Sequence, residues 1–520
     1  MVRFKIRIRT IVVLCFVLAA LSAALQAGTQ AERPPEYREL VRALRIEDLA
    51  ARLKELERIK AAYPESQYRL MIDNQILGVK VEMADKLETI LDLQRSVLES
   101  SQSAQRPLYY FTYSLDILQH KNLAKFDKKK VTQAVEQYMA EAHRAASDPE
   151  FLKTSPPQQQ AYLKSNLPNF YIALAMAFLN EGKPERAMQA LEDFRKNGGR
   201  PEKMFYYTLG RTQDKLGRDK EALEAYFEAA VENYEDAYVK ARELWEKVHK
   251  SGAGFADKLE ARQRELPFHP EPFQPEAGSW KGKAVLAELF TGSECPPCVA
   301  ADLGFDGLIE GYERQHLAVL VYHLPIPRPD PMTNKASRGR ALFYGVNSTP
   351  TTFFDGEKKG GGGGQRPMAQ EKYKEYAAAV NERVFAAPEV KLKVSARISG
   401  DSVQVKFSAD KELPGADYHI VLVQKEEKYL GSNGLYFHKL VVRDFVTLDA
   451  ATAKGGSTRF SIMQAEADAE ARLDEVENER AFTFSERHSR IDRENLSVVL
   501  FLQNSESKTV YNAAVAPVTK

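Results

Sequence analysis

Two cysteines spaced as Cys295-Pro-Pro-Cys298 are the residues of this chain best suited to chemistry. The chain of 520 residues has 3 cysteines, and the third, Cys15, lies in an apolar N-terminal run. A dithiol with two intervening residues, in a chain that otherwise avoids cysteine, indicates redox chemistry rather than a disulfide framework. Such a pair needs a strand and a helix to hold it.

The sequence around the dithiol predicts an alternating α/β pattern. Short apolar runs are typical of buried strands, and the stretches between them have helical periodicity. The predicted elements are a strand at 284–290, a helix up to about Arg314, a strand at 317–322, a helix at 333–344, a strand at 351–354 and a helix at 370–385.

This order, together with two segments, resembles the thioredoxin fold. The segments are ELFTGSECPPC at 288–298 and STPTTFFDG at 348–356. More narrowly, they are similar to a branch of secreted thioredoxin-like proteins. The likeness covers about 280–386 and implies a thiol-disulfide oxidoreductase that acts on protein thiols or disulfides and is recycled by a redox partner. No cofactor is implied.

The two cysteines are expected to play different parts. Cys295 would lie just ahead of a helix, whose N-terminal N–H groups favour the thiolate, so we expect it to be exposed and to attack. Cys298, one turn further, should be more buried and should resolve a mixed disulfide. Pro296 and Pro297 stiffen the loop, contact the substrate and tune the reduction potential. Glu294 replaces an aromatic residue of thioredoxin, and its charge should oppose thiolate formation.

Further site residues follow from the resemblance. It implies a cis Thr349–Pro350 bond beside the dithiol, with Thr349 presenting backbone groups to an extended substrate. Glu288 is the candidate for a buried carboxylate that accepts the Cys298 proton, the alternative being a solvent-facing strand residue. His323 ends the second strand on the active-site side, where it either supports the site or serves as an ordinary turn residue.

Two other functions remain open at this point. Two thiolates with His323 would suit Cu(I), although copper-delivery proteins of this fold space their cysteines by three residues. A closed zinc site would have to recruit histidines. The other alternative is a non-catalytic interaction scaffold with a structural disulfide. We expect no metal.

Residues 36–250 are predicted to be helical. Ala187 and Ala222 lie 35 residues apart, and the packing positions around them resemble tetratricopeptide repeats, best at 168–236. The resemblance implies protein–protein contacts through the repeats, or a plain scaffold. An apolar stripe opens this region, formed by Leu40, Leu44, Leu49, Leu53, Leu56 and Ile59.

The remaining segments complete a multidomain chain. Prolines at 265–279 predict a linker, and alternating strands at 388–520 predict a C-terminal β-sandwich interrupted by a solvated, charged insertion at 464–494. The glycines at 360–364 predict a mobile loop. His438 and Asp444 are interpreted as isolated core or loop residues.

Composition and the N-terminus bound the location and the partners. Residues 1–27 have the basic start and apolar core of a signal peptide, which predicts export to the periplasm or beyond, with membrane attachment if the leader is uncleaved. Removing the four basic residues of the leader from a net charge of +1 leaves −3. Nothing in this charge favours a nucleic-acid partner.

Overall fold

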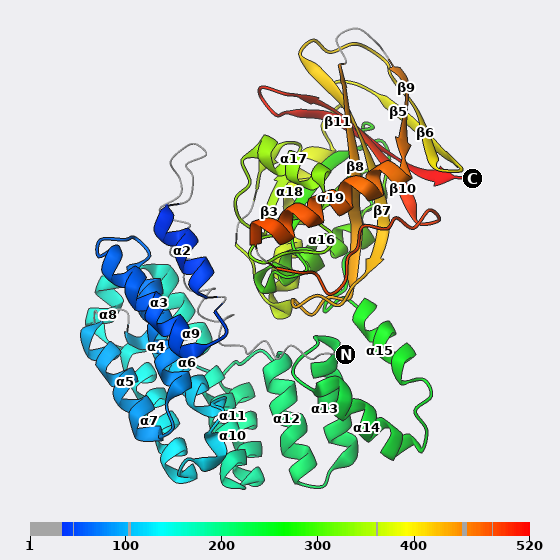
Figure 1. Cartoon of the computed structure of the whole chain (residues 1–520). Helices are drawn as coiled ribbons and strands as arrows, with labels where there is room; N and C mark the ends of the chain where they lie inside the picture. The colour runs from blue at the N-terminus through cyan, green and yellow to red at the C-terminus, as the bar shows by residue number, and fades with distance from the viewer. Residues whose placement is uncertain (1–33, 45, 102–105, 360–361, 450–454, 481) are drawn as a thin grey trace. The chain divides into compact units, whose positions relative to one another are not determined.

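The computed structural model describes residues 34–44, 46–101, 106–359, 362–449, 455–480 and 482–520 (Figure 1). The predicted signal peptide at 1–27 lies outside these residues. The chain forms two compact units: one takes in the residues up to 229 and 239–250, and the other takes in 230–238 and 251–520. In the described part of the chain, no helix is long and apolar enough to cross a membrane.

The first unit is helical, as the sequence predicted, and short antiparallel helices run side by side in it. The α-helices are α2 Pro35–Ala43, α3 Leu49–Ala62, α4 Arg69–Met83, α5 Leu87–Ser100, α6 Arg106–Leu118, α7 Lys128–Ala146, α8 Pro149–Thr154, α9 Pro157–Asn166, α10 Asn169–Glu181, α11 Pro184–Lys196, α12 Lys203–Lys215, α13 Asp219–Val231 and α14 Ala237–His249.

The first apolar stripe belongs to two helices rather than one. Helix α2 ends at Ala43 and α3 starts after Asp48, whose carboxylate accepts a hydrogen bond from the Ala51 amide. An aspartate N-cap of this kind starts a new helix because it satisfies amides that have no intrahelical partner. The stripe is still core, since Leu56 and Ile59 are fully buried.

Helices α12 and α13 approach closely at a glycine. A Cβ on Gly210 would lie 2.8 Å from the Tyr226 ring. A small residue at this position therefore lets the two helices meet.

The continuous part of the second unit, 251–520, opens with helix α15, Phe255–Arg264, which is followed by the proline-rich segment. This segment has no helix or strand, but its aromatic side chains pack against the rest of the unit. Phe268 is buried against Tyr373 with ring centroids 5.2 Å apart, and Phe273 stacks on Tyr312 at 4.9 Å. The residues predicted as a linker thus form part of the second unit's core.

The predicted strands around the dithiol form adjacent strands of one sheet. They are β1 Val285–Thr291, β2 Leu317–His323 and β3 Thr351–Phe354, and a two-residue strand that was not predicted, β4 Glu357–Lys358, joins them. Strand β1 pairs parallel with β2 and antiparallel with β3, and β3 pairs antiparallel with β4. The helices between and after them are α16 Val299–Gly311, α17 Lys335–Tyr344 and α18 Ala369–Val384.

Residues of β1 alternate between two apolar cores. Val285, Ala287 and Leu289 pack with residues of α16 and α18. Leu286 and Phe290 face the other side, where they pack with α17 and with C-terminal strands. Side chains of neighbouring strand residues point to opposite faces, so position in β1 decides which core a residue joins.

The C-terminal strands continue the same sheet, so the region predicted as a C-terminal domain does not stand apart from the strands around the dithiol. The sheet has 11 strands in the order β4-β3-β1-β2-β8-β7-β10-β11-β5-β6-β9, and β8 pairs with β2 at Val321 and Val441. A core shared by β5, β6, β7 and β10 fills the C-terminal part. The C-terminal strands are β5 Leu392–Ser399, β6 Ser402–Ala409, β7 Ala416–Lys428, β8 Phe437–Asp449, β9 Gly455–Ser461, β10 Leu496–Asn504 and β11 Val510–Thr519.

The insertion at 464–494 is not a solvated excursion. Helix α19, Ile462–Arg480, lies across β8 in Figure 1 and buries Ile462, Leu473 and Val476. Most of its charged residues are exposed or half-buried, and the buried Arg472 is bound by Glu475 and Glu479 of the same helix.

Candidate functional site

The dithiol is closed as a disulfide at the start of α16. Cys295 and Cys298 are bonded, with their Cα atoms 5.4 Å apart. Cys295 has extended backbone angles and precedes a single 3₁₀ turn, Pro296–Cys298, that leads into α16. The prolines suit this turn because their φ is pre-set for it and a first-turn amide has no intrahelical partner to lose.

Both cysteines are fully buried, with exposed fractions of 0%. The prediction that Cys295 is exposed while Cys298 is covered is therefore wrong for this disulfide form. Of the two intervening prolines, Pro296 is buried and Pro297 is partly exposed.

Thr349 lies against the Cys295 sulfur, and the Thr349–Pro350 peptide bond is cis, as predicted. The Thr349 hydroxyl oxygen is 3.4 Å from Cys295 Sγ, and the Thr349 carbonyl oxygen is 3.9 Å from it. The same hydroxyl donates to the Ile326 carbonyl oxygen at 2.8 Å. The fold thus brings four predicted residues together: both cysteines, Thr349 and Pro350.

Part of the glycine run packs against the dithiol loop. The Gly364 amide donates to the Pro297 carbonyl oxygen at 2.7 Å, and the Ala300 amide donates to the Gly364 carbonyl oxygen at 3.0 Å. A Cβ on Gly363 would lie 1.8 Å from that Pro297 oxygen. At 362–364 the run predicted to be a mobile loop is a close-fitting cover, because glycine alone allows this approach. Residues 360–361 lie outside the described chain.

Glu288 is buried but is not brought to Cys298. It shares its side of β1 with Leu286 and Phe290, facing away from the core that α16 joins. The alternative prediction, a solvent-facing residue, is also wrong, since its exposed fraction is 0%. The Arg340 guanidinium binds both carboxylate oxygens, at 2.8 and 3.0 Å.

Two tyrosines complete the Glu288 site. Tyr322 and Tyr344 donate their hydroxyls to the carboxylate at 3.0 and 2.7 Å. Burial, reinforced by the Glu288 charge, raises the pKa of both phenols above the ordinary value, so they remain donors. With four donated bonds, Glu288 serves as the ionic centre of the core behind β1.

Asp302 is a buried carboxyl group on the dithiol side of the sheet. It follows Cys298 by four residues, a spacing that places the two side chains on one face of a helix. Thr291, at the end of β1, donates its hydroxyl to Asp302 Oδ2 at 3.0 Å. Burial raises the pKa of Asp302 well above its usual range. Asp302 was not predicted from the sequence, although its four-residue spacing from Cys298 is a local signal.

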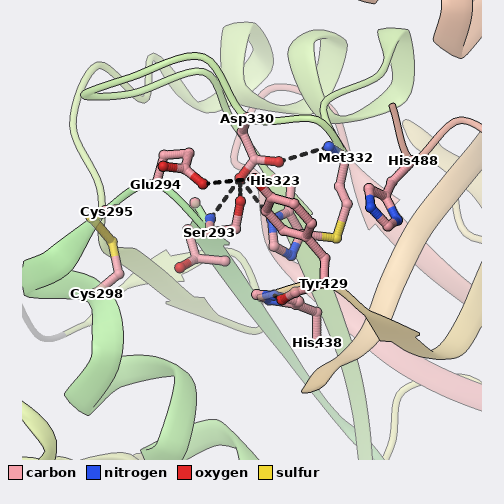
Figure 2. Close-up of polar contacts among 12 residues, drawn as sticks. Ser293, Glu294, Cys295, Cys298, His323, Asp330, Met332, Tyr429, His438 and His488 are labelled. Carbon is pink, nitrogen blue, oxygen red and sulfur yellow. Dashed lines mark hydrogen bonds and ion pairs between the residues drawn. A yellow bond between two sulfur atoms is a disulfide. The ribbon is translucent and has the colours of Figure 1, made fainter. Parts of the chain in front are cut away.

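A second buried carboxylate, Asp330, holds the segment before the dithiol (Figure 2). Its Oδ2 accepts bonds from the Ser293 amide at 2.6 Å, the Ser293 hydroxyl at 3.0 Å and His323 Nδ1 at 3.0 Å. Its Oδ1 accepts from the Met332 amide at 2.8 Å. Burial acts to raise the pKa of Asp330, but the His323 charge and these bonds outweigh it, so the pKa lies below the ordinary value.

His323 is therefore a buried partner of Asp330, with an exposed fraction of 1%. Its ring lies 5.1 Å from that of His438 on β8. The His438 ring, interpreted from sequence as isolated, is thus part of the site's surroundings. Among the described residues, no group of three histidine, cysteine, aspartate or glutamate side chains is arranged to hold a metal ion.

The connection between β7 and β8 also reaches the dithiol segment. Tyr429 donates its hydroxyl to Glu294 at 3.0 Å, and the Asn433 amide donates to the Ser293 carbonyl oxygen at 3.1 Å. Sequence reasoning missed these residues because they lie more than 130 positions beyond the dithiol and carry no motif. Asp330 gave a weak signal: a lone acid between two prolines, seven residues after His323.

Comparisons with known proteins add little to this geometry. No protein-family model matches the chain, and no curated protein matches it. Among solved structures, it is similar to a crystal structure of an Agrobacterium tumefaciens protein from a structural genomics consortium. The identity is 16% and the TM-score 0.29, over 48% of this chain and 97% of that chain.

Proposed function

We propose that the protein is a thiol-disulfide oxidoreductase that acts on protein disulfides or dithiols through Cys295 and Cys298. The observation that carries the proposal is the placement of the two bonded sulfurs at the start of α16, with Thr349 against the first of them. A helix N-terminus favours thiolate over thiol, which is the form that attacks disulfides.

The proposed chemistry needs two exchanges. In the reductive direction, the Cys295 thiolate attacks a client disulfide, and the client's other sulfur leaves as a thiolate. Cys298 then loses its proton and attacks the Cys295 sulfur, which releases the client's second thiolate and leaves the Cys295–Cys298 disulfide. Two electrons pass to the client, and a dithiol partner restores the pair. Oxidation of a client dithiol follows the same steps in reverse.

The strand pattern supports a thioredoxin-like domain at 280–386 as the frame for this chemistry. Parallel β1 and β2, antiparallel β3 and the helices α16 and α18 against one face follow the order that the resemblance implies. We also propose tetratricopeptide-like repeats at 168–236, supported by the close approach of Gly210 and Tyr226. Export through the leader at 1–27 is part of the same proposal.

A second candidate function is an interaction scaffold with a structural disulfide. The observation that favours it is the complete burial of both cysteines. Because Cys295 is fully buried, a client can reach it only after part of its surroundings moves, whereas a structural bridge needs no such motion. The two functions therefore differ in how readily the bridge opens.

The deciding experiment is a mixed-disulfide trap in the native compartment. Cys298→Ser removes the thiol that resolves the mixed disulfide on Cys295. Client proteins should therefore accumulate as covalent adducts that reduction releases. The matched control is Cys295→Ser in the same background, which should trap nothing. The purified wild type should also cycle with dithiothreitol and reduce insulin. An empty trap, with a bridge that resists dithiothreitol, would support the scaffold instead.

A further inference from the structure

The carboxylate of Glu294, next to the proposed attacking cysteine, accepts hydrogen bonds from the connection between β7 and β8. Glu294 directly precedes Cys295, and a carboxylate there should raise the energy of the thiolate. The side chain is half-buried and directed toward Tyr429 in Figure 2. Its Oε1 accepts the Tyr429 hydroxyl at 3.0 Å and the Ser432 amide at 3.3 Å. Two donors therefore compensate the charge.

Tyr429 is suited to act as a permanent donor. Burial, together with the Glu294 charge, raises its pKa well above the ordinary value, so the hydroxyl keeps its proton at every pH at which a thiol titrates. Its backbone is fixed as well, because its carbonyl oxygen accepts a bond from His438 Nε2 at 2.9 Å. Burial and the His323 charge lower the pKa of His438 to about 3, which keeps that ring neutral.

The connection also lies directly on the backbone before the dithiol. A Cβ on Gly431 would be 2.4 Å from the Ser293 carbonyl oxygen. Asn433, with an exposed fraction of 2%, donates its backbone amide to that oxygen and its side-chain amide to the Gly292 carbonyl oxygen at 3.5 Å. This fit fixes Tyr429 relative to Glu294.

We propose that the β7–β8 connection is a positioning element of the redox site: Tyr429 compensates the charge of Glu294 and thereby favours the Cys295 thiolate. The C-terminal strands would then set the reactivity of the dithiol as well as completing the sheet. The inference deepens the proposed function and rests on it for its biological meaning, but it concerns a property of the reduced protein that can be measured without any client.

A double-mutant cycle tests the proposal. All variants carry Cys298→Ser, so that Cys295 is the thiol followed, and its alkylation by iodoacetamide is measured across pH. Tyr429→Phe should slow alkylation at pH 6 about threefold, as expected for a partly uncompensated charge on the residue that precedes the cysteine. Glu294→Gln should speed it. In the Glu294→Gln background, Tyr429→Phe should have no effect.

The control is Tyr436→Phe, which removes a hydroxyl from the same connection but not from Glu294; it should leave the pH profile unchanged. Near-ultraviolet circular dichroism checks that each variant is folded. Equal slowing by Tyr429→Phe in both backgrounds would overturn the proposal, since tyrosine would then act through packing. Unchanged alkylation in both would overturn it too. If the alkylation profile of Cys295 responds as expected but the Cys298→Ser variant traps no client, the proposed function would be wrong and this inference would still hold.

Discussion

The hydroxyl of Thr349 lies between two acceptors, the Cys295 sulfur at 3.4 Å and the Ile326 carbonyl oxygen at 2.8 Å. One hydroxyl proton cannot serve both. In the disulfide it favours the nearer carbonyl oxygen, whereas a thiolate at Cys295 would be the stronger acceptor. Thr349 therefore has a donor available for the reduced state.

Replacing Thr349 by valine should make Cys295 less reactive. The loss of a hydrogen bond to a charged sulfur, worth roughly 1.5 kcal/mol, should slow iodoacetamide alkylation about tenfold at a pH below the midpoint of the profile. Thr349→Ser keeps the hydroxyl and is the control. Equal rates for the valine and serine variants would show that the hydroxyl gives no support to the thiolate.

Breaking the Glu288–Arg340 pair should destabilise the fold without changing the reactivity of the two cysteine thiols. Glu288→Gln leaves a guanidinium with an exposed fraction of 4% without its anion, at a cost of about 3 kcal/mol. Urea denaturation measures this loss, and combining Glu288→Leu with Arg340→Met should recover much of it. Should Glu288→Gln instead change the alkylation profile of Cys298 at unchanged stability, the sequence-based role for Glu288 would be right.

Asp306, four residues after Asp302 on α16, should make the protein less stable as pH rises. Burial raises the pKa of its carboxyl to about 6, against 3.8 when free. As pH rises, the Asp306 carboxyl therefore loses its proton in the unfolded chain before it does so in the folded protein. Its contribution to the free energy of unfolding is fully present below about pH 4 and is lost as pH rises through 6, a change of about 3 kcal/mol. Asp306→Asn should flatten this part of the urea-denaturation profile between pH 4 and 7. A slope that the variant leaves unchanged would assign the effect to other groups.

Gly363→Ala should loosen the cover over the dithiol loop. The new methyl group cannot fit 1.8 Å from the Pro297 carbonyl oxygen, so the segment 362–364 must move away. We expect the disulfide to be reduced several-fold faster by dithiothreitol, an effect that a mass shift after alkylation would follow. Gly339→Ala, where nothing lies within 4 Å of the added carbon, is the matched control. Identical reduction rates for the two variants would mean that this segment does not limit access.

The sequence predicted the elements around the dithiol well, because their signals are local. Strand β3 was predicted at 351–354 and is observed there, and the predicted helix at 370–385 is Ala369–Val384. Prolines, an apolar run or a two-residue cysteine spacing act within a few positions. The cis Thr349–Pro350 bond was expected from the resemblance to the thioredoxin fold rather than from such a local pattern.

Long-range relations were not predictable in the same way. Glu288 was expected near Cys298, but its position in the alternation of β1 directs it to the opposite core. There it binds Arg340, which lies 52 residues further along the chain. Nothing local reveals that partner. The pairing of β8 with β2 was missed for the same reason, since a strand's own residues do not encode its neighbour in the sheet.

The shared sheet limits how this molecule can be dissected. Cutting after residue 386 would strip β2 of its neighbour β8 and leave main-chain amides and carbonyls open along a fresh edge, which invites aggregation. It would also take away Gln503, which binds Arg340 at 2.8 Å. A fragment truncated to the region around the dithiol should therefore be insoluble, and moving the dithiol loop into another protein requires both halves of the sheet.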